Sequence, residues 1–216
     1  CFKNNKFKEK NLTSVTNFTR PNPKMKEWLS KMKSWTIWAS VDGIGDVTEY
    51  IRYPSNFKKI TENLNYYKKL LHTYGNGKIT FSPAIQLLNI HQLDDMLKWF
   101  IKFSEGDWGN TVDISWMSQV WYPRICNYDT APREYRLWVA DKLEKSVDYF
   151  SDYAGISFFY NKQIDNLRID TLGKQVEKNL QMSFVRYNDT QDRHRKRTTW
   201  RGLLPLLEEA LTKNQN

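Results

Sequence analysis

Apolar and polar residues follow two alternating periods in the N-terminal part of the chain. A β-branched run at 12–17 and an apolar run at 35–43, closed by Asp-Gly, are typical of buried strands. Between them, the apolar residues of 25–32 keep the three-to-four spacing of an amphipathic helix, with two prolines just before it. The pattern therefore predicts a strand, a short helix and a second strand.

The same alternation continues up to residue 120. Residues 57–74 keep a helical spacing and are followed by Gly75. A strand interrupted by Pro83 is expected over 78–88, then a helix over 91–103 and a strand over 111–120. Strands that alternate with helical crossovers indicate a parallel α/β sheet or barrel.

The pattern becomes helical after Pro123. We expect a helix over 132–150 and shorter helical stretches over 174–184 and 203–211, with no strand. The chain is therefore interpreted as an α/β part, residues 1–122, followed by a mainly helical C-terminal extension, residues 123–216.

Composition excludes two classes of protein. With 40% hydrophobic and 15% aromatic residues, the chain has too much to bury for a disordered protein. No apolar run reaches the roughly 18 residues of a membrane span. The net charge of +9 raises the possibility of a nucleic-acid partner, but much of the excess lies in 3–10 and 193–201. That distribution favours solubility as the reason for the charge.

Cysteine and histidine give no metal site. Cys1 and Cys126 are far apart and belong to no Cys-x2-Cys pair, so neither a disulfide scaffold nor a metal site is indicated. His72, His91 and His194 lie on unrelated segments, without ligand spacing. No signal-peptide pattern is present, and we expect a reducing, cytoplasmic compartment.

Polar residues end three expected strands in succession. Thr16 and Asn17 follow the first, Ser40 and Asp42 the second, and Asn89 the third. These residue types are also ordinary turn formers. In parallel α/β folds, however, functional residues collect where strands end, and three such ends predict one common rim.

These segments resemble a known enzyme family. The residues Val15-Thr16-Asn17, the Ser-x-Asp-Gly of 40–43, Ile51-Arg52 and the strand ending near Asn89 are similar to the later two-thirds of a radical S-adenosylmethionine (radical SAM) enzyme. The subgroup it resembles carries a SPASM- or twitch-type C-terminal extension. The similarity covers about 12–122, with a weaker one at 192–205.

The resemblance implies a fold and a set of roles. The fold would be a partial (β/α) TIM-like barrel, whose four strands correspond to the third through sixth of a six-stranded half-barrel. Ser40 would contact the cofactor's ribose or carboxylate, and Arg52 would pair with the methionyl carboxylate, which suits a planar charged fork. The other residues of this cofactor rim would be Thr16, Asn17, Asp42 and Asn89.

Two tryptophans flank the last expected strand. By the same resemblance, Trp116 and Trp121 would wall the substrate cavity. The alternative is that they are buried core aromatics, which is the commoner role of such side chains.

The family's defining motif is absent from the chain. The Cys-x3-Cys-x2-Cys thiolates that hold a [4Fe–4S] cluster do not occur, nor does the Gly-Gly-Glu segment. We therefore interpret the chain as the C-terminal portion of such an enzyme, inactive alone, whose partner is the missing N-terminal part. In the intact enzyme, S-adenosylmethionine and the cluster would generate a 5′-deoxyadenosyl radical that modifies a peptide, a protein or another sizeable substrate.

Two other functions remain open. One is a basic, aromatic-rich binding module for nucleic acid or nucleotides. The other is a non-catalytic half-barrel partner protein, which cluster cysteines encoded upstream would eliminate. An incomplete barrel would also expose the edge of the strand at 12–16, so we predict dimerisation or aggregation through that edge.

Overall fold

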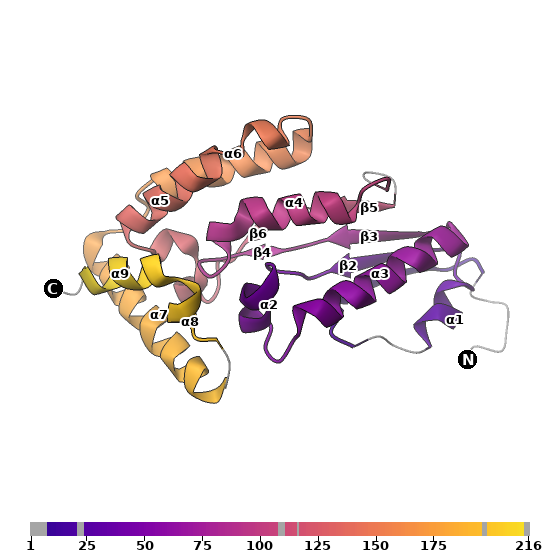
Figure 1. Ribbon diagram of the computed structural model, residues 1–216, viewed down its shortest axis with the longest axis horizontal. Coiled ribbons are helices and arrows are strands. Elements are labelled where there is room, and N and C mark those ends of the chain that lie inside the picture. The colour runs from indigo at the N-terminus through magenta and orange to yellow at the C-terminus, as the bar shows by residue number, and fades with distance from the viewer. Residues whose placement is uncertain (1–7, 21–23, 108–110, 116, 196–197, 214–216) are drawn as a thin grey trace. The chain divides into compact units, whose positions relative to one another are not determined.

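The computed structural model describes residues 8–20, 24–107, 111–115, 117–195 and 198–213. The chain forms two compact units, Cys1–Pro83 with Leu97–Met117, and Ala84–Met96 with Ser118–Asn216 (Figure 1). The functional division after residue 122, expected from the sequence, stays a prediction.

The first unit is built on a four-stranded parallel sheet. Its strands are β1 (Asn11–Thr16), β2 (Ser34–Ala39), β3 (Gly77–Phe81) and β5 (Val112–Ile114), in the order β1-β2-β3-β5. Its helices are α1 (Met25–Leu29), α2 (Gly45–Ile51), α3 (Phe57–Tyr74) and the Leu97–Phe103 part of α4 (Leu93–Phe103). The expected mixed α/β class with a parallel sheet is confirmed.

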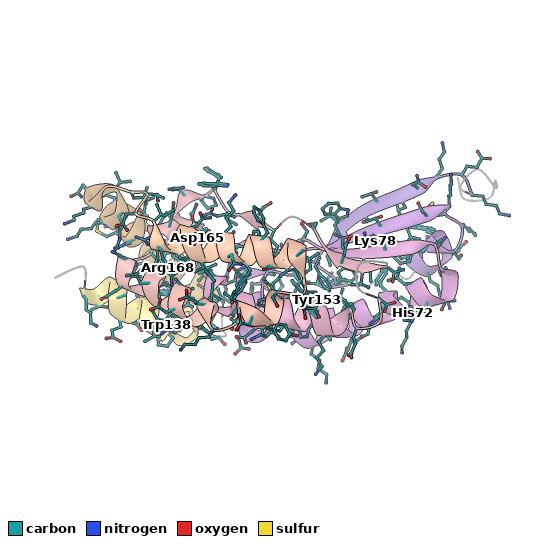
Figure 2. The ribbon with its side chains drawn as sticks, turned by 90° about the horizontal axis from the view of Figure 1, so that it is seen from above. His72, Lys78, Trp138, Tyr153, Asp165 and Arg168 are labelled. Carbon is teal, nitrogen blue, oxygen red and sulfur yellow. The ribbon has the colours of Figure 1, made fainter. Side chains whose placement is uncertain are left out.

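Spatial order in this sheet follows chain order. Right-handed crossovers between successive neighbouring strands place all the connecting helices on one face of the sheet. Ile37, Ile79 and Val112 share one face and are buried, whereas on the other face Thr36 and Lys78 are half-buried and Thr80 is buried. Figure 2 shows Lys78 within the sheet and His72 on helix α3, which lies along one side of the sheet. One face of the sheet is therefore covered by helices, and the other carries polar side chains.

An aromatic cluster attaches α4 to the covered face. The Phe81 ring, at the end of β3, stacks on Phe100 with 4.1 Å between centroids and an interplanar angle of 15°. Trp99 and Phe103 meet the same ring with edge contacts, at 6.0 and 5.6 Å. Such ring pairs contribute about 0.5–1.5 kcal/mol each beyond their buried area.

Helix α3 has the predicted bounds because its two ends are capped by sequence-encoded signals. The Asn56 side chain accepts a hydrogen bond from the Lys59 amide at 3.0 Å. Gly75 adopts a left-handed φ of 65° and donates its N–H to the Leu71 carbonyl oxygen at 2.8 Å. The apolar face that both caps enclose carries the buried residues Ile60, Leu64, Tyr67, Leu70 and Leu71.

The second unit is mainly helical. A two-stranded parallel sheet pairs β4 (Ala84–Ile85) with β6 (Ser118–Gln119). The α-helices that follow are α5 (Arg133–Glu144), α6 (Ala154–Arg168), α7 (Lys174–His194), α8 (Trp200–Leu203) and α9 (Pro205–Lys213). The 3₁₀ turns are η2 (Ile90–Gln92), η3 (Arg124–Cys126), η4 (Tyr128–Thr130) and η5 (Asp148–Phe150). As expected, the residues described after Pro123 contain no strand.

A buried arginine joins two helices of this unit. Arg136 on α5 is 2% exposed and donates to the carbonyl oxygens of Leu167 and Ile169, at 3.0 and 2.8 Å. These carbonyls lie at the C-terminal end of α6, where no intrahelical donor remains. Arg168, labelled in Figure 2, adds an exposed ion pair to Glu144 at 2.7 Å.

Several expected elements differ in the structure. The strand expected over 78–88 is two strands in different sheets, because Pro83 has no N–H to continue the ladder. The strand expected over 111–120 likewise divides into β5 and β6. The helix expected over 174–184 continues to His194, and helices α2 and α6 were not expected.

A glycine on β3 provides a test of the packing. A Cβ added at Gly77 would lie 2.1 Å from the indole of Trp35, which is itself buried. We expect Gly77→Ala to lower the free energy of unfolding by roughly 1–3 kcal/mol through overpacking. Gly155→Ala on α6 is the control, since no atom lies within 4 Å of its Cβ position and its stability should not fall. Urea titration followed by circular dichroism measures both; equal effects would contradict the packing argument.

Candidate functional site

The turn after β2 lies beside the end of β1. The Ser40 amide donates to the Thr16 carbonyl oxygen at 2.9 Å, so the strand ladder continues into this turn. Val41 and Asp42 are buried within it. Gly45, with a φ of 55°, starts α2 in a conformation that a residue with a Cβ rarely adopts. The carboxyl ends of β1 and β2 thus form one edge, while the third strand end of the predicted rim, near Asn89, belongs to the second unit.

An ion pair joins the two ends of this segment. Asp42 is 3% exposed, and its Oδ2 lies 2.7 Å from Nε and 2.6 Å from Nη2 of Arg52. Arg52 directly follows α2, so the pair spans the turn and the helix. Among the described residues none forms a hydrogen bond or ion pair with Nη1 of Arg52, which leaves donors for a further acceptor.

Thr16 and Asn17 shape the turn after β1. Thr16 Oγ1 accepts from the Phe18 amide at 3.1 Å, and Asn17 Oδ1 accepts from the Thr19 amide at 3.2 Å. Phe18 is held at a left-handed φ of 56°, and Asn63 donates to its carbonyl oxygen at 2.6 Å. Left-handed non-glycine residues cost free energy and collect at functional sites. The two predicted rim side chains therefore support the rim backbone in this structure.

Ser40 is the rim residue whose side chain is least engaged. Its hydroxyl makes no hydrogen bond within the described part of the chain, and the residue is half-buried. Continuing the alternation of β2, Ser40 lies on the face of Thr36 and Trp38. Thr16 instead shares the helix-covered face with Ala39.

Asn89 and Trp121 belong to the second unit. Asn89 is 1% exposed; its Oδ1 accepts from the Gln86 amide at 2.7 Å, and its Nδ2 donates to the Ala84 carbonyl oxygen at 2.8 Å. Trp121 is 63% exposed, with the guanidinium of Arg124 at 5.6 Å from its ring centroid. Trp116 lies outside the described residues.

The first unit therefore holds five of the predicted site residues together. They are Thr16, Asn17, Ser40, Asp42 and Arg52.

The structure also reveals a polar cluster that sequence reasoning missed. On the uncovered face, Lys78 Nζ lies 2.5 Å from Asp113 Oδ2. Asp113 Oδ1 is buried and has no hydrogen-bond partner among the described residues. Thr80 is in register with Asp113 on the neighbouring strand, and Trp38 with Thr80. The signal was the polar residue at every second position of β3, and a carboxylate placed this way can accept from a ligand's donor.

Part of the basic C-terminal segment is engaged internally. Arg201 pairs with Asp189 on α7 and with Glu208 on α9, the latter at 3.0 Å. The Trp200 Nε1–H also donates to Asp189 at 2.8 Å. The hydrogen bond from Arg201 holds the pKa of Asp189 below its ordinary value. Arg201 thus connects three helices.

The described residues fit no metal ion. No group of three His, Cys, Asp or Glu among them could hold one. Cys126 is half-buried, and burial raises the pKa of its thiol, so little thiolate forms at neutral pH. Thiolate ligands for an iron–sulfur cluster are therefore not found in this part of the chain.

No described helix has the length and apolarity to cross a membrane.

Comparison with known proteins returned no relative: no family model, curated protein or solved structure matches the chain. The resemblance to radical SAM enzymes therefore rests on the residues quoted above.

A half-buried histidine lies in the second unit. Burial, and then the Lys142 ammonium, lower the pKa of His91 to about 4, while Asp94 and Asp95 act in the opposite direction. Lys142 Nζ donates to the His91 carbonyl oxygen at 2.7 Å and pairs with Asp94 at 2.8 Å. His91 is therefore neutral in the folded protein over most of the acidic range.

Because of His91, we expect the free energy of unfolding to fall as the pH decreases. Between pH 6.5 and about 4 the unfolded chain binds a proton at His91 that the folded chain does not, so stability falls as the pH decreases through that window. The loss reaches up to about 3 kcal/mol at 1.36 kcal/mol per unit. His91→Gln should flatten this part of the profile. Urea midpoints measured at each pH test this; an unchanged slope in His91→Gln would contradict it.

Proposed function

We propose that this chain is the portion of a radical SAM enzyme, with a twitch-type extension, that binds the cofactor's amino-acid end and faces the substrate. The observation that carries the proposal is the Asp42–Arg52 pair. It joins the Ser-x-Asp-Gly turn to the downstream Ile-Arg at the carboxyl edge of a parallel sheet. The intact enzyme would modify a peptide, a protein or another sizeable substrate in the cytoplasm.

The strand order supports a partial TIM-like barrel. Doubly wound sheets reverse their strand order at a switch point, whereas barrel strands follow one another in chain order. The order β1-β2-β3-β5, with one face covered by helices, is the barrel-type arrangement. In such a barrel the uncovered face would turn inward, and the Lys78–Asp113 cluster would meet the substrate.

The rim residues fit one end of S-adenosylmethionine. Arg52 would bind the methionyl carboxylate through Nη1, because Asp42 already occupies Nε and Nη2. Asp42 would position the guanidinium, and the Ser40 hydroxyl would donate to a ribose or carboxylate oxygen. S-adenosylmethionine supplies the radical chemistry when bound, and this chain would orient it. The proposal requires cluster thiolates from outside the described residues.

The first experiment extends the gene upstream of Cys1 and analyses the purified protein, prepared without oxygen, for iron and sulfide. The proposal predicts an encoded Cys-x3-Cys-x2-Cys and about four irons per chain. An upstream frame without the motif and a protein without iron would reject it and favour a binding module. Steeply salt-dependent binding to single-stranded nucleic acid would then identify that alternative.

The second experiment tests Arg52 in that extended protein. Arg52→Lys keeps the charge but loses the fork, so we expect S-adenosylmethionine affinity to fall about tenfold or more. Arg124→Lys is a matched control, since Arg124 pairs with the buried Asp129 through Nη2–Oδ2 at 2.6 Å and is similarly exposed. Calorimetric titration measures both. Equal losses in the two variants would mean that Arg52 acts through stability alone.

A further inference from the structure

The outer edge of β1 carries backbone groups with no strand beside them in the described part of the chain. Because Thr16 accepts from Ser40, its peptide groups face β2. Along a strand the N–H and C=O of successive residues point to alternate sides. Those of Asn11, Thr13 and Val15 therefore point away from the sheet, where the strand order ends. This edge offers three donors and three acceptors.

The opposite edge of the sheet is short and partly occupied. β5 has three residues, and the outward N–H of Val112 already donates to the Asp107 carbonyl oxygen at 3.1 Å. β1 has six residues and contains none of the proline, charged residues or bulges with which proteins protect an edge. Val15 on it is 69% exposed. The two edges differ in their capacity to accept another strand.

We propose that β1 pairs antiparallel with β1 of a second copy of this chain, about a two-fold axis at Thr13. This register places Thr13 opposite Thr13 and Asn11 opposite Val15 of the other copy. Every outward residue then belongs to a hydrogen-bonded pair that exchanges two bonds, which uses all three donors and acceptors of each copy. The two parallel sheets become one mixed sheet, as is common in large sheets. The pairing is a property of the 216-residue chain: in the intact enzyme of the proposed function, a preceding barrel strand would occupy this edge of β1 instead.

Charge favours the same register. Lys10 lies opposite Thr16 of the other copy, and Glu9 opposite Asn17, so like charges do not face each other across the axis. Leu12, half-buried on the helix-covered face, gains Ser14 of the other copy as a neighbour. Since one strand pair is a small interface, the dimer is weak and its population depends on concentration.

Sedimentation equilibrium of the full 216-residue chain over a micromolar concentration series tests this. The average mass should rise from 25.8 kDa toward twice that value. Thr13→Lys and Thr13→Glu should each be monomeric, because like charges meet at the axis. An equimolar mixture of the two should dimerise again. Thr73→Lys, on the exposed surface of α3, is the matched charge control and should dimerise like the parent chain.

A second variant removes the hydrogen bond without adding charge. Thr13→Pro deletes an outward N–H and leaves the ladder to β2 intact. It should raise the dimer dissociation constant at least tenfold while the circular dichroism spectrum stays unchanged. A parent chain that is monomeric at every concentration overturns the proposal, as do Thr13→Lys and Thr13→Glu variants that still dimerise alone. A mixture that fails to pair overturns the register. None of these outcomes changes the iron content that tests the enzymatic proposal.

Discussion

One-sided coverage of the parallel sheet is the constraint on which the first unit depends. Phe81, Ile79 and Ile37 present a continuous apolar face, and the Phe81–Phe100 stack attaches α4 to it. With the strands in chain order, right-handed crossovers leave no helix to cover the opposite face. Polar side chains therefore predominate at the alternate positions of β2 and β3, such as Thr36, Lys78 and Thr80, although Trp38 and the exposed Val15 share that face. The polar character of this face follows in part from topology.

Hydrogen bonds and an ion pair hold the turns of the candidate rim in place. The turn residues after β1 and β2 use their side chains to hold backbone, as Thr16 does for Phe18. Asp42 is buried within its turn and needs a positively charged partner, because burying an unpaired carboxylate costs free energy. Arg52 supplies that charge while part of its side chain stays exposed. The ion pair holds the guanidinium in one orientation, and Nη1 makes no hydrogen bond among the described residues. A preorganised donor of this kind suits a carboxylate ligand.

The sequence was most informative where local signals and burial agreed. β2 and α3 were predicted because their apolar periods are uninterrupted and α3 carries both caps, whereas β1 was predicted from its β-branched run although none of its residues is buried. α2 was missed because it is a seven-residue helix entered through glycines, and the breaks near Pro83 and Met117 divided two expected strands. The functional rim, inferred from turn residues that recur after strands, stays a prediction. The Lys78–Asp113 pair was not predicted, because it joins strands 35 residues apart and only the strand order makes them neighbours.

Burial of side chains decreases across the sheet toward β1, the strand at its open edge. In one row of the register, Trp35 on β2 is 1% exposed, whereas its partner Leu12 on β1 is half-buried. Coverage by helices therefore decreases toward β1, where only the short α1 connects the strands. A sheet whose cover diminishes at one edge, and whose outward backbone groups there are regular, has the physical character of a surface completed by another strand. Thr16 ends the strand at that edge, and the antiparallel partner strand of the proposed dimer would place its amino end beside Thr16.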